Sequence, residues 1–268
     1  METILLLLAA FGTAVLGAVC GIGGGILFKP LLDAFSGMGA AAASFLSGCT
    51  VLSMASVSLL RAVTRARRPQ GRENPLNLRV CALLSVGAVA GGVLGRQLFS
   101  LLERRVSGGV AGAAQSAAIL LMCAGVLAYL FTKEHIRAHK IDHPAPIAGT
   151  GLALGVLSSF LGIGGGPFNH VALSFLFGMD TKTGAANSLL IVFFAQAASL
   201  AGTAVTGAWP AFDVHTLLLM CAGGALGGLA GSAISRHAGQ RHVDWTLRAA
   251  LVLIMGVSAY NMARFLGW

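Results

Sequence analysis

The stretch Gly21-Ile22-Gly23-Gly24-Gly25 decides the fold of this chain, and it occurs again as Gly162-Ile163-Gly164-Gly165-Gly166. Each copy follows an apolar run long enough to cross a membrane, and the copies lie 141 residues apart in a chain of 268. Glycines at this density break a helix, because each loses more conformational freedom than alanine would. Irregular backbone inside a bilayer is tolerated only where protein buries it or where it lines a water-filled cavity. Paired breaks in two halves therefore indicate the binding site of a transporter.

The composition is that of a membrane protein. Hydrophobic residues make up 56% of the chain and charged residues only 10%, and the mean hydropathy is +0.82. Soluble domains carry about 25% charged residues. The apolar runs have the length of helices rather than strands, which excludes an outer-membrane barrel. We therefore expect an all-α, multi-pass protein of the cell inner membrane.

Charge and cysteine usage narrow the possible partners. The net charge of +9 comes mostly from arginines between the apolar runs, which is typical of positive-inside topology and of contact with anionic membrane lipid. The arginines are not interleaved with aromatic residues, so nucleic acid is not expected as a partner. The cysteines lie within apolar runs at spacings that do not suit a metal, and we interpret them as buried thiols. No metal or other cofactor is expected.

The chain reads as two similar halves. In the first half we expect spans at 3–20, 40–60, 80–98 and 110–131 and a short segment at 26–35. The second half repeats this order, with spans at 147–161, 183–205, 214–235 and 245–266 and a short segment at 167–177. A segment of this length covers only about half of the ~30 Å hydrocarbon core, so each is expected to be a glycine-broken or re-entrant helix. The sequence thus predicts a first repeat at 1–131, a linker at 132–146 and a second repeat at 147–268.

The similarity between the halves extends beyond the glycines. Gly37-Met38 matches Gly178-Met179 at the same offset, and Ser47 then falls opposite Ser188. The stretch 91–95 resembles 227–231 at an offset of 136. Eight helices in two four-helix repeats would make the repeats parallel, whereas an odd number of crossings in each would invert them.

The basic loop 61–79 is expected in the cytoplasm, and eight spans would then place both termini inside. Three arginines, Arg96, Arg104 and Arg105, do not fit this topology, because it leaves them outside.

The residues that follow each break are the first candidates for chemistry. Lys29 falls opposite His170 at the repeat offset, and Asn169 lies beside the histidine. Each would lie in the first turn of a short helix, where free N–H groups and the helix dipole attract anions. We expect an anion site at two facing helix ends, built from Gly23, Gly24, Gly25, Lys29, Gly164, Gly165, Gly166, Asn169 and His170. Lys29 could instead extend to the membrane interface, and His170 could bond to a neighbouring helix.

Further polar residues complete the candidate site. Asp33 lies four residues after Lys29, so it could pair with the lysine or couple transport to protons, as could His170. The following spans contribute Ser47, Asn187, Ser188 and Gln196 to the predicted site. Serines of this kind also join helices without binding anything. The sequence lacks a nucleophile elbow or a clustered metal motif, and we do not expect an enzyme. His135, His139 and His143 could line one helix face of the linker and bind a metal, but a solvated linker is favoured.

The whole pattern resembles the sulfite and organosulfonate exporter family known as TauE/SafE. The resemblance rests on the two Gly-Ile-Gly-Gly-Gly runs and on the stretch 178–189, in which Lys182, Asn187 and Ser188 stand near the family's lysine and Thr-Ser positions. The first-half equivalent, 37–47, lacks the lysine. The resemblance implies transport of small sulfur-containing anions such as sulfite or sulfoacetate. We expect a secondary transporter of a small anion with alternating access between the repeats; a passive anion channel and a non-transport membrane assembly subunit are the alternatives.

Overall fold

The computed structural model describes residues 2–66, 77–106, 108–133, 139, 141–163, 165–207 and 209–266. This part of the chain contains ten α-helices and no strand, so the all-α prediction is confirmed. The helices are α1 Glu2–Cys20, α2 Gly25–Phe35, α3 Ala40–Ala66, α4 Leu78–Arg105, α5 Gly108–Thr132, α6 Pro144–Leu161, α7 Gly166–Phe177, α8 Thr181–Thr206, α9 Val214–His237 and α10 Gln240–Phe265.

Polar residues fix where several of these helices begin. The side chains of Asn77 and Asp213 accept hydrogen bonds from the first turns of α4 and α9, and Pro144 opens α6 behind the cap residue His143. Such caps satisfy N–H groups that have no partner inside the helix. Among the described residues, seven helices are long and apolar enough to cross a membrane, and the apolar part of α1, Leu5–Cys20, is shorter. The predicted count of eight spans is therefore not confirmed.

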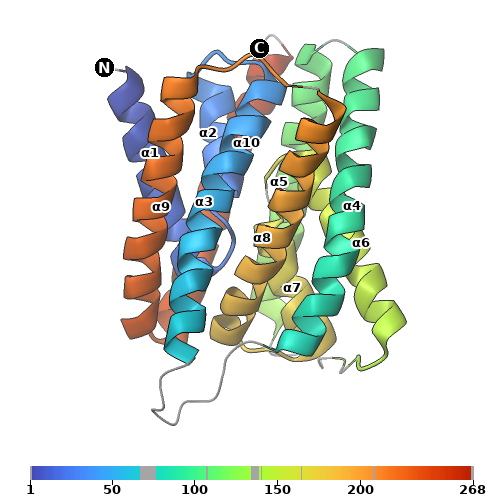
Figure 1. The fold of residues 1–268 in the computed structure, drawn as a ribbon, viewed down its shortest axis with the longest axis vertical. Coiled ribbons are helices and arrows are strands. Elements are labelled where there is room, and N and C mark those ends of the chain that lie inside the picture. Colours follow the sequence, from blue (N-terminus) through green and yellow to red (C-terminus); the bar gives the residue numbers. More distant parts are fainter. Residues whose placement is uncertain are drawn as a thin grey trace.

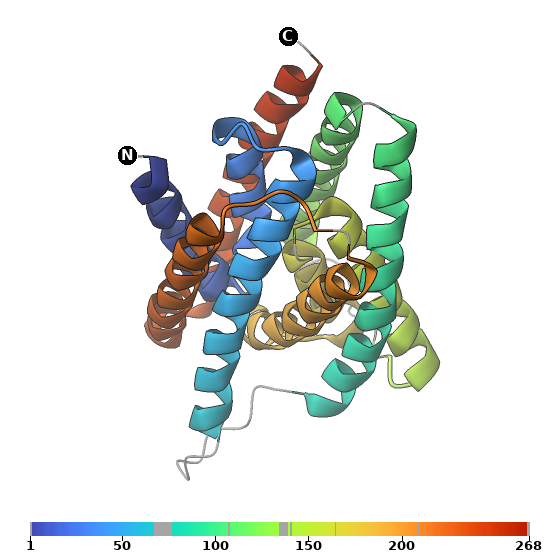
Figure 2. The same ribbon diagram turned by 45° about the horizontal axis from the view of Figure 1, so that its top comes forward.

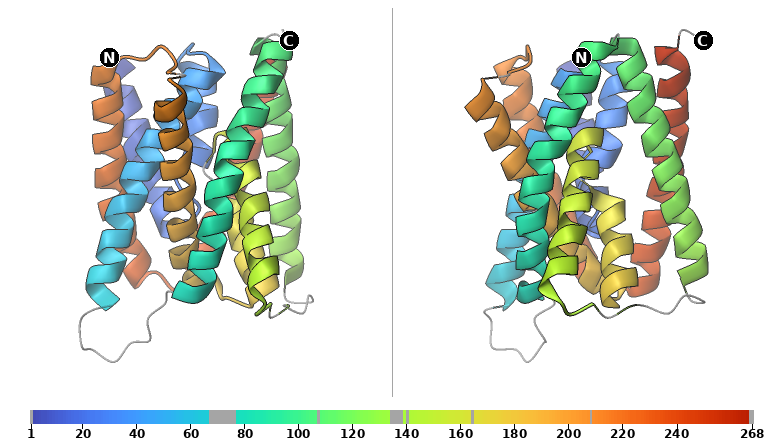
Figure 3. Two further views of the ribbon diagram at one scale, coloured as in Figure 1. Left: turned by 45° about the vertical axis from the view of Figure 1, so that its right-hand side comes forward. Right: turned by 90° about the vertical axis from the view of Figure 1, so that its right-hand side faces the viewer.

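The two short helices turn back instead of crossing. Figure 1 and Figure 3 show α1 descending from the end of the bundle that holds both termini, and α2 returning toward that end. We call it the termini end. The opposite end, where α3 stops at Ala66 and α4 starts at Leu78, is the basic end. From there α6 rises and α7 returns to it, so main-chain bonds join His139 and Ile141, just before α6, to Phe175 and Leu176 of α7.

These directions decide between the two relations of the repeats that the sequence left open, and they correct the predicted position of the termini. Because each broken pair starts and finishes at one end of the bundle, α1 and α6 run in opposite directions, which is the inverted relation. Both termini also lie opposite the basic end, whereas the predicted topology placed them on the same side as the 61–79 loop. The error arose from counting α1 as a complete crossing without the return of α2. Arg104 and Arg105 lie in the last turn of α4, at the termini end.

Glycine stripes join helices of different halves backbone to backbone. A Cβ on Gly91 of α4 would lie 2.1 Å from the Leu152 carbonyl oxygen of α6, and a Cβ on Gly227 of α9 would lie 2.5 Å from the Phe11 carbonyl oxygen of α1. Small residues permit this close approach in membranes. The stripes are Gly87, Gly91 and Gly95 on α4 and Gly223, Gly227 and Gly231 on α9. Each glycine of the α4 stripe lies 136 residues before its counterpart on α9, as Gly91 does before Gly227. Their carbonyl partners, Leu152 and Phe11, are 141 residues apart. The two helix contacts are therefore equivalent in the two halves.

The sequence halves are consequently interleaved. The helix pairs α1 with α9 and α4 with α6 each take one member from each predicted repeat, and Figure 2 shows α1 beside α9 and α6 beside α4. Helix α3 packs on α9 through Gly224 and Gly228, and α8 packs on α4 through Gly92. The bundle thus has one group formed by α1, α3 and α9 and another formed by α4, α6 and α8.

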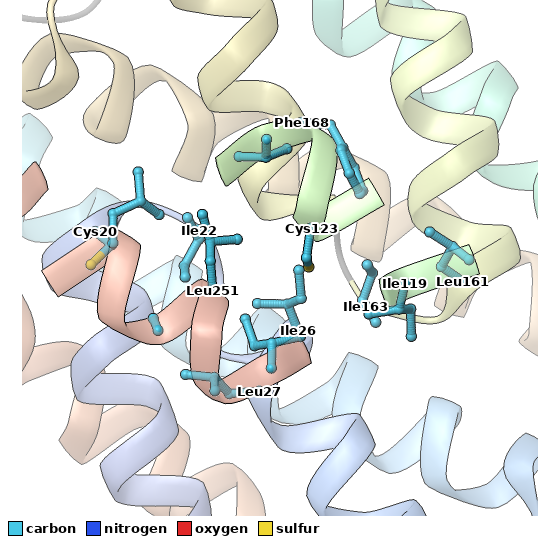
Figure 4. Packing of buried hydrophobic residues seen from close by; sticks show 14 of the residues in the cluster. Cys20, Ile22, Ile26, Leu27, Ile119, Cys123, Leu161, Ile163, Phe168 and Leu251 are labelled. Atoms are coloured by element: carbon cyan, nitrogen blue, oxygen red, sulfur yellow. The ribbon is translucent and has the colours of Figure 1, made fainter. Parts of the chain in front are cut away.

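The two glycine breaks meet where the groups join. The Ile22 carbonyl oxygen of the first break lies over Gly166, at only 1.5 Å from where a Cβ would stand, and the Ile163 carbonyl oxygen of the second lies 3.0 Å from a Cβ on Gly25. Figure 4 shows Ile22 and Ile163 within one apolar cluster, to which α5 and α10 contribute Ile119, Cys123 and Leu251. Protein therefore encloses both irregular segments, as the bilayer requires.

The topology gives the first prediction. A cysteine introduced at Gln70, which lies outside the described residues between α3 and α4, should react with an impermeant maleimide only from the cytoplasm, because the adjoining sequence is rich in arginine. A tag after Trp268 should be reached only from the opposite side. Permeabilised cells serve as the control and should expose both positions. Labelling of both positions from one side of intact membranes would contradict the re-entrant path.

The meeting of the breaks gives the second prediction. Gly166→Ala should lower the apparent melting temperature strongly, because its Cβ collides with main chain; overpacking costs about 1–3 kcal/mol where neighbours can move. Gly25→Ala should have a smaller effect, since its Cβ meets the Val51 side chain at 2.6 Å and main chain only at 3.0 Å, whereas on Gly166 the main-chain contact is 1.5 Å. Gly202→Ala on α8, with open space around it, is the matched control. Equal melting temperatures for the Gly166 and Gly202 variants would mean that the breaks do not pack as described.

Candidate functional site

Each break delivers a helix N-terminus into the centre of the bundle. In the described part of the chain, neither α2 nor α7 receives a side-chain hydrogen bond at its N-cap, which is Gly24 in α2 and Gly165 in α7. Gly165 has φ of 77°, a left-handed conformation that favours glycine. Gly23 and Gly25 are buried in the first break, while Gly164 lies outside the described residues. Uncapped N–H groups at two helix ends leave donors for an anion.

Lys29 reaches from one half to the break of the other. Its side chain is completely buried, and its Cε lies 3.2 Å from where a Cβ on Gly162 would stand. The ammonium forms the expected ion pair with Asp33 one turn later. The other carboxylate oxygen, Oδ1, has no hydrogen-bond partner within the described part of the chain. Lys29 therefore does not extend to the interface; its buried side chain reaches Gly162, the first residue of the second break.

His170 bridges to the opposite half by a different contact. Its Nε2 donates to the Cys20 carbonyl oxygen at the end of α1, and Gly184 of α8 lies against the other face of the ring. This is the helix-to-helix bond that the sequence allowed as an alternative. Asn169 beside it is 2% exposed, and its Oδ1 has no partner among the described residues. The second helix end therefore offers an amide rather than a charge.

Three serines lie around the meeting point. Ser47 of α3 donates weakly to the Gly25 carbonyl oxygen at 3.5 Å. The Ser44 hydroxyl lies 2.5 Å from a Cβ on Gly162. Ser188 of α8 corresponds in sequence to Ser47 and is completely buried. Neither Ser44 nor Ser188 has a hydroxyl partner within the described residues, so both keep hydrogen-bonding capacity that burial makes costly to leave unused.

Asn187 does not join this group. Its Oδ1 accepts from the Asn77 main-chain N–H at 2.9 Å and from the Cys81 thiol at 2.7 Å. Its Nδ2 donates to the Thr183 carbonyl oxygen at 2.7 Å. These bonds join α8 to the first turn of α4. The structure thus gives Asn187 a connection between helices, and its predicted role toward substrate stays untested.

Gln196 lies farther along α8, three residues before Ser199, which the site prediction did not include. Its Oε1 lies 3.5 Å from where a Cβ on Gly48 would stand. One turn later, Ser199 accepts a hydrogen bond of 3.2 Å from the Arg96 guanidinium of α4. The sequence analysis placed Arg96 in the predicted span 80–98, toward the outer side, but did not count it among the site residues. Its position directly after Gly95, inside a glycine-patterned run, was the signal that this arginine faces another helix.

Helix α10 holds the return of α2 in place. Asn261 donates to the Pro30 carbonyl oxygen at 2.7 Å, and Arg264 donates to the Asp33 carbonyl oxygen at 2.9 Å and to that of Ala34. In the same way, Tyr129 of α5 donates to Ser174 of α7 at 3.2 Å. Each short helix is thus anchored by the last span of the opposite half. This anchoring fixes the depth of their N-termini.

The linker histidines do not form a group with the site. His143 caps α6 through its Nδ1, and the His139 ring packs edge-on against Phe175, while His135 lies outside the described residues. In the part of the chain that the structure describes, no three His, Cys, Asp or Glu side chains are placed to hold a metal ion.

Comparison with known proteins agrees with this geometry. The family model described as sulfite exporter TauE/SafE matches residues 6–262, nearly the whole chain. No curated protein and no solved structure matches the chain significantly. The match includes both breaks and every helix that contributes to the candidate site. This chain therefore belongs to the sulfite exporter TauE/SafE family of membrane transporters.

Proposed function

We propose that this protein is a secondary transporter that moves a small anion, such as sulfite, sulfoacetate or a related organic acid, across the inner membrane. The observation that carries the proposal is the meeting of two uncapped helix N-termini beside the buried Lys29. Family membership supports the transporter class, and the site chemistry supports an anion.

The electrostatics of the meeting point favour an anion over a neutral or cationic ligand. Each helix N-terminus contributes roughly half a positive charge, and the Lys29 ammonium adds a full one. The buried hydroxyl groups of Ser188 and Ser44 have no partner among the described residues and can donate, whereas the unpaired Asn169 atom is an amide oxygen, which only accepts. Two charges 4 Å apart interact by about 4 kcal/mol at an effective dielectric constant of 20. An anion at this place would also satisfy donors that otherwise remain without partners.

Asp33 is the internal competitor for Lys29. The carboxylate pairs with the ammonium when no other anion is bound, so an entering anion has to displace it or share the lysine with it. Protonation of Asp33 would release the lysine, which gives a route to proton coupling. A buried pair of this kind is costly to desolvate, and its persistence inside a span is typical of a functional site.

Alternating access follows from the packing groups rather than from the sequence halves. The glycine stripes fix α1, α3 and α9 together and α4, α6 and α8 together, whereas the breaks meet between the two groups. We propose that the groups rock against each other about this meeting point. The anion is then exposed first toward one end of the bundle and then toward the other.

A passive channel would use the same broken helices without closing at either end. Counterflow separates the two possibilities: proteoliposomes loaded with unlabelled sulfite should accumulate ³⁵S-sulfite transiently above equilibrium if the protein is a carrier. Simple equilibration with no overshoot would favour a channel. A protein that neither binds nor moves any sulfur-containing anion would favour the assembly-subunit alternative.

The competition at Lys29 gives the third prediction. Asp33→Asn should bind sulfite about tenfold more tightly, because the anion no longer displaces a carboxylate; a charge-assisted hydrogen bond contributes roughly 1.5–3 kcal/mol. The double variant Lys29→Met/Asp33→Asn should lose sulfite binding while remaining folded, since it removes both buried charges together. Lys29→Met alone leaves an unpaired buried carboxylate and should destabilise the protein by about 3–5 kcal/mol.

Lys182→Met is the matched control for the loss of one positive charge. Binding can be measured with ³⁵S-sulfite on the purified protein, with the melting temperature recorded in parallel. The control should bind like the wild type. If the double variant keeps wild-type affinity, the anion does not bind at Lys29 and the site lies elsewhere.

A further inference from the structure

Arg96 is a second cation within a span, and the central site does not use it. It lies on α4, nine residues before the helix ends at Arg105, or about 14 Å along the axis. Its side chain is half-buried. Among the described residues it forms no ion pair, and its guanidinium donates only to the Ser199 hydroxyl at 3.2 Å. An arginine this deep in a span normally pairs with an acid or with several carbonyl groups, because burying its charge is costly.

Two helices bring polar groups to this arginine. The Cys49 thiol of α3 lies within electrostatic range of the guanidinium. Gln196 and Ser199 project from α8, three residues apart, and Gln196 lies against Gly48 beside the cysteine. The Gln196 amide is 6% exposed and makes no hydrogen bond within the part of the chain that the structure describes. Donors and a cation are therefore gathered here, while no acid balances them.

We propose that Arg96, Gln196 and Ser199 form a second anion-binding site, which receives the transported anion from the termini end. This inference rests on the proposed function. The guanidinium fork matches the paired oxygens of a sulfite or sulfonate group, the Gln196 amide donates a further hydrogen bond, and Ser199 orients the arginine. Because α4 and α8 both run toward the termini end, the three residues lie in the half of each helix that is nearer that end.

Arg61 on α3 offers a matched comparison. It is also a half-buried arginine on a span, but its guanidinium donates to the Leu229 carbonyl oxygen at 2.7 Å, which joins α3 to α9. Its charge is thus engaged with main chain, in a contact between helices near the basic end. Arg61→Gln and Arg96→Gln each remove one positive charge, the first from a main-chain contact and the second from the proposed second site.

The test measures ³⁵S-sulfite transport in proteoliposomes that hold the protein in one orientation. Arg96→Gln should raise KM about tenfold for sulfite offered at the termini end and leave KM at the basic end unchanged. Arg96→Lys should give an intermediate KM, and Arg61→Gln should leave KM unchanged at both ends. An unaltered KM for Arg96→Gln, or an equal change at both ends, would overturn the second site.

A labelling experiment keeps this test separate from the central proposal. In a variant whose only cysteine is Cys49, an anionic sulfonatoethyl thiosulfonate reagent should react faster than a cationic one, each relative to its rate with a free thiol. Arg96→Gln should abolish this preference. If the wild type transports no sulfite but the preference depends on Arg96, the anion site stands and the proposed substrate is wrong. If Arg96→Gln leaves the preference intact, Arg96 does not attract anions there.

Discussion

Everything in this bundle depends on covering two pieces of irregular backbone where no water is available to satisfy them. A break rich in glycine exposes N–H and C=O groups that a helix would pair internally. Each break is covered mainly by the other: the Ile22 carbonyl lies over Gly166, and the Ile163 carbonyl lies near Gly25. Glycine at both places is a steric requirement, because a side chain would separate the two main chains. The same contact brings two helix N-termini together, which is the basis of the proposed anion site.

The closeness of the breaks explains the glycine stripes elsewhere. For the breaks to meet, α1 has to approach α9 and α6 has to approach α4 until their backbones touch, and only residues as small as Gly91 and Gly227 permit that. Since each pair contains one helix from each sequence half, the halves cannot separate as independent bodies. The proposed motion would therefore occur at the seam between the packing groups, where Lys29 and Ser47 lie.

The positions of the helices along the chain could be predicted from the sequence, but the direction in which each short helix runs through the bundle could not. Helix boundaries such as Gly25–Phe35 and Gly166–Phe177 were predicted within a residue, because glycine runs and apolar periods act locally. Whether α2 crosses or returns depends on tertiary contacts such as Asn261 with Pro30, and no local pattern specifies those. Arg96 was left out of the predicted site for a related reason: its contact with Ser199 joins two helices and is not visible in the local sequence. Asn187 was selected as a polar residue in a span, although its bonds to Asn77 and Cys81 are specific to the folded state.

The two halves differ most at the residues that the repeat offset aligns. Lys29 carries a charge balanced by Asp33, whereas His170 donates to a main-chain carbonyl. A single anion at the meeting point requires one cation nearby; a second full charge would add desolvation cost and hold the anion too tightly to release it. The histidine therefore serves the architecture of the second half, and its partner at Cys20 fixes the end of α1. The duplicated breaks supply two matching helix ends. Because the aligned side chains have diverged, Lys29 is the one that faces the anion in the proposed site.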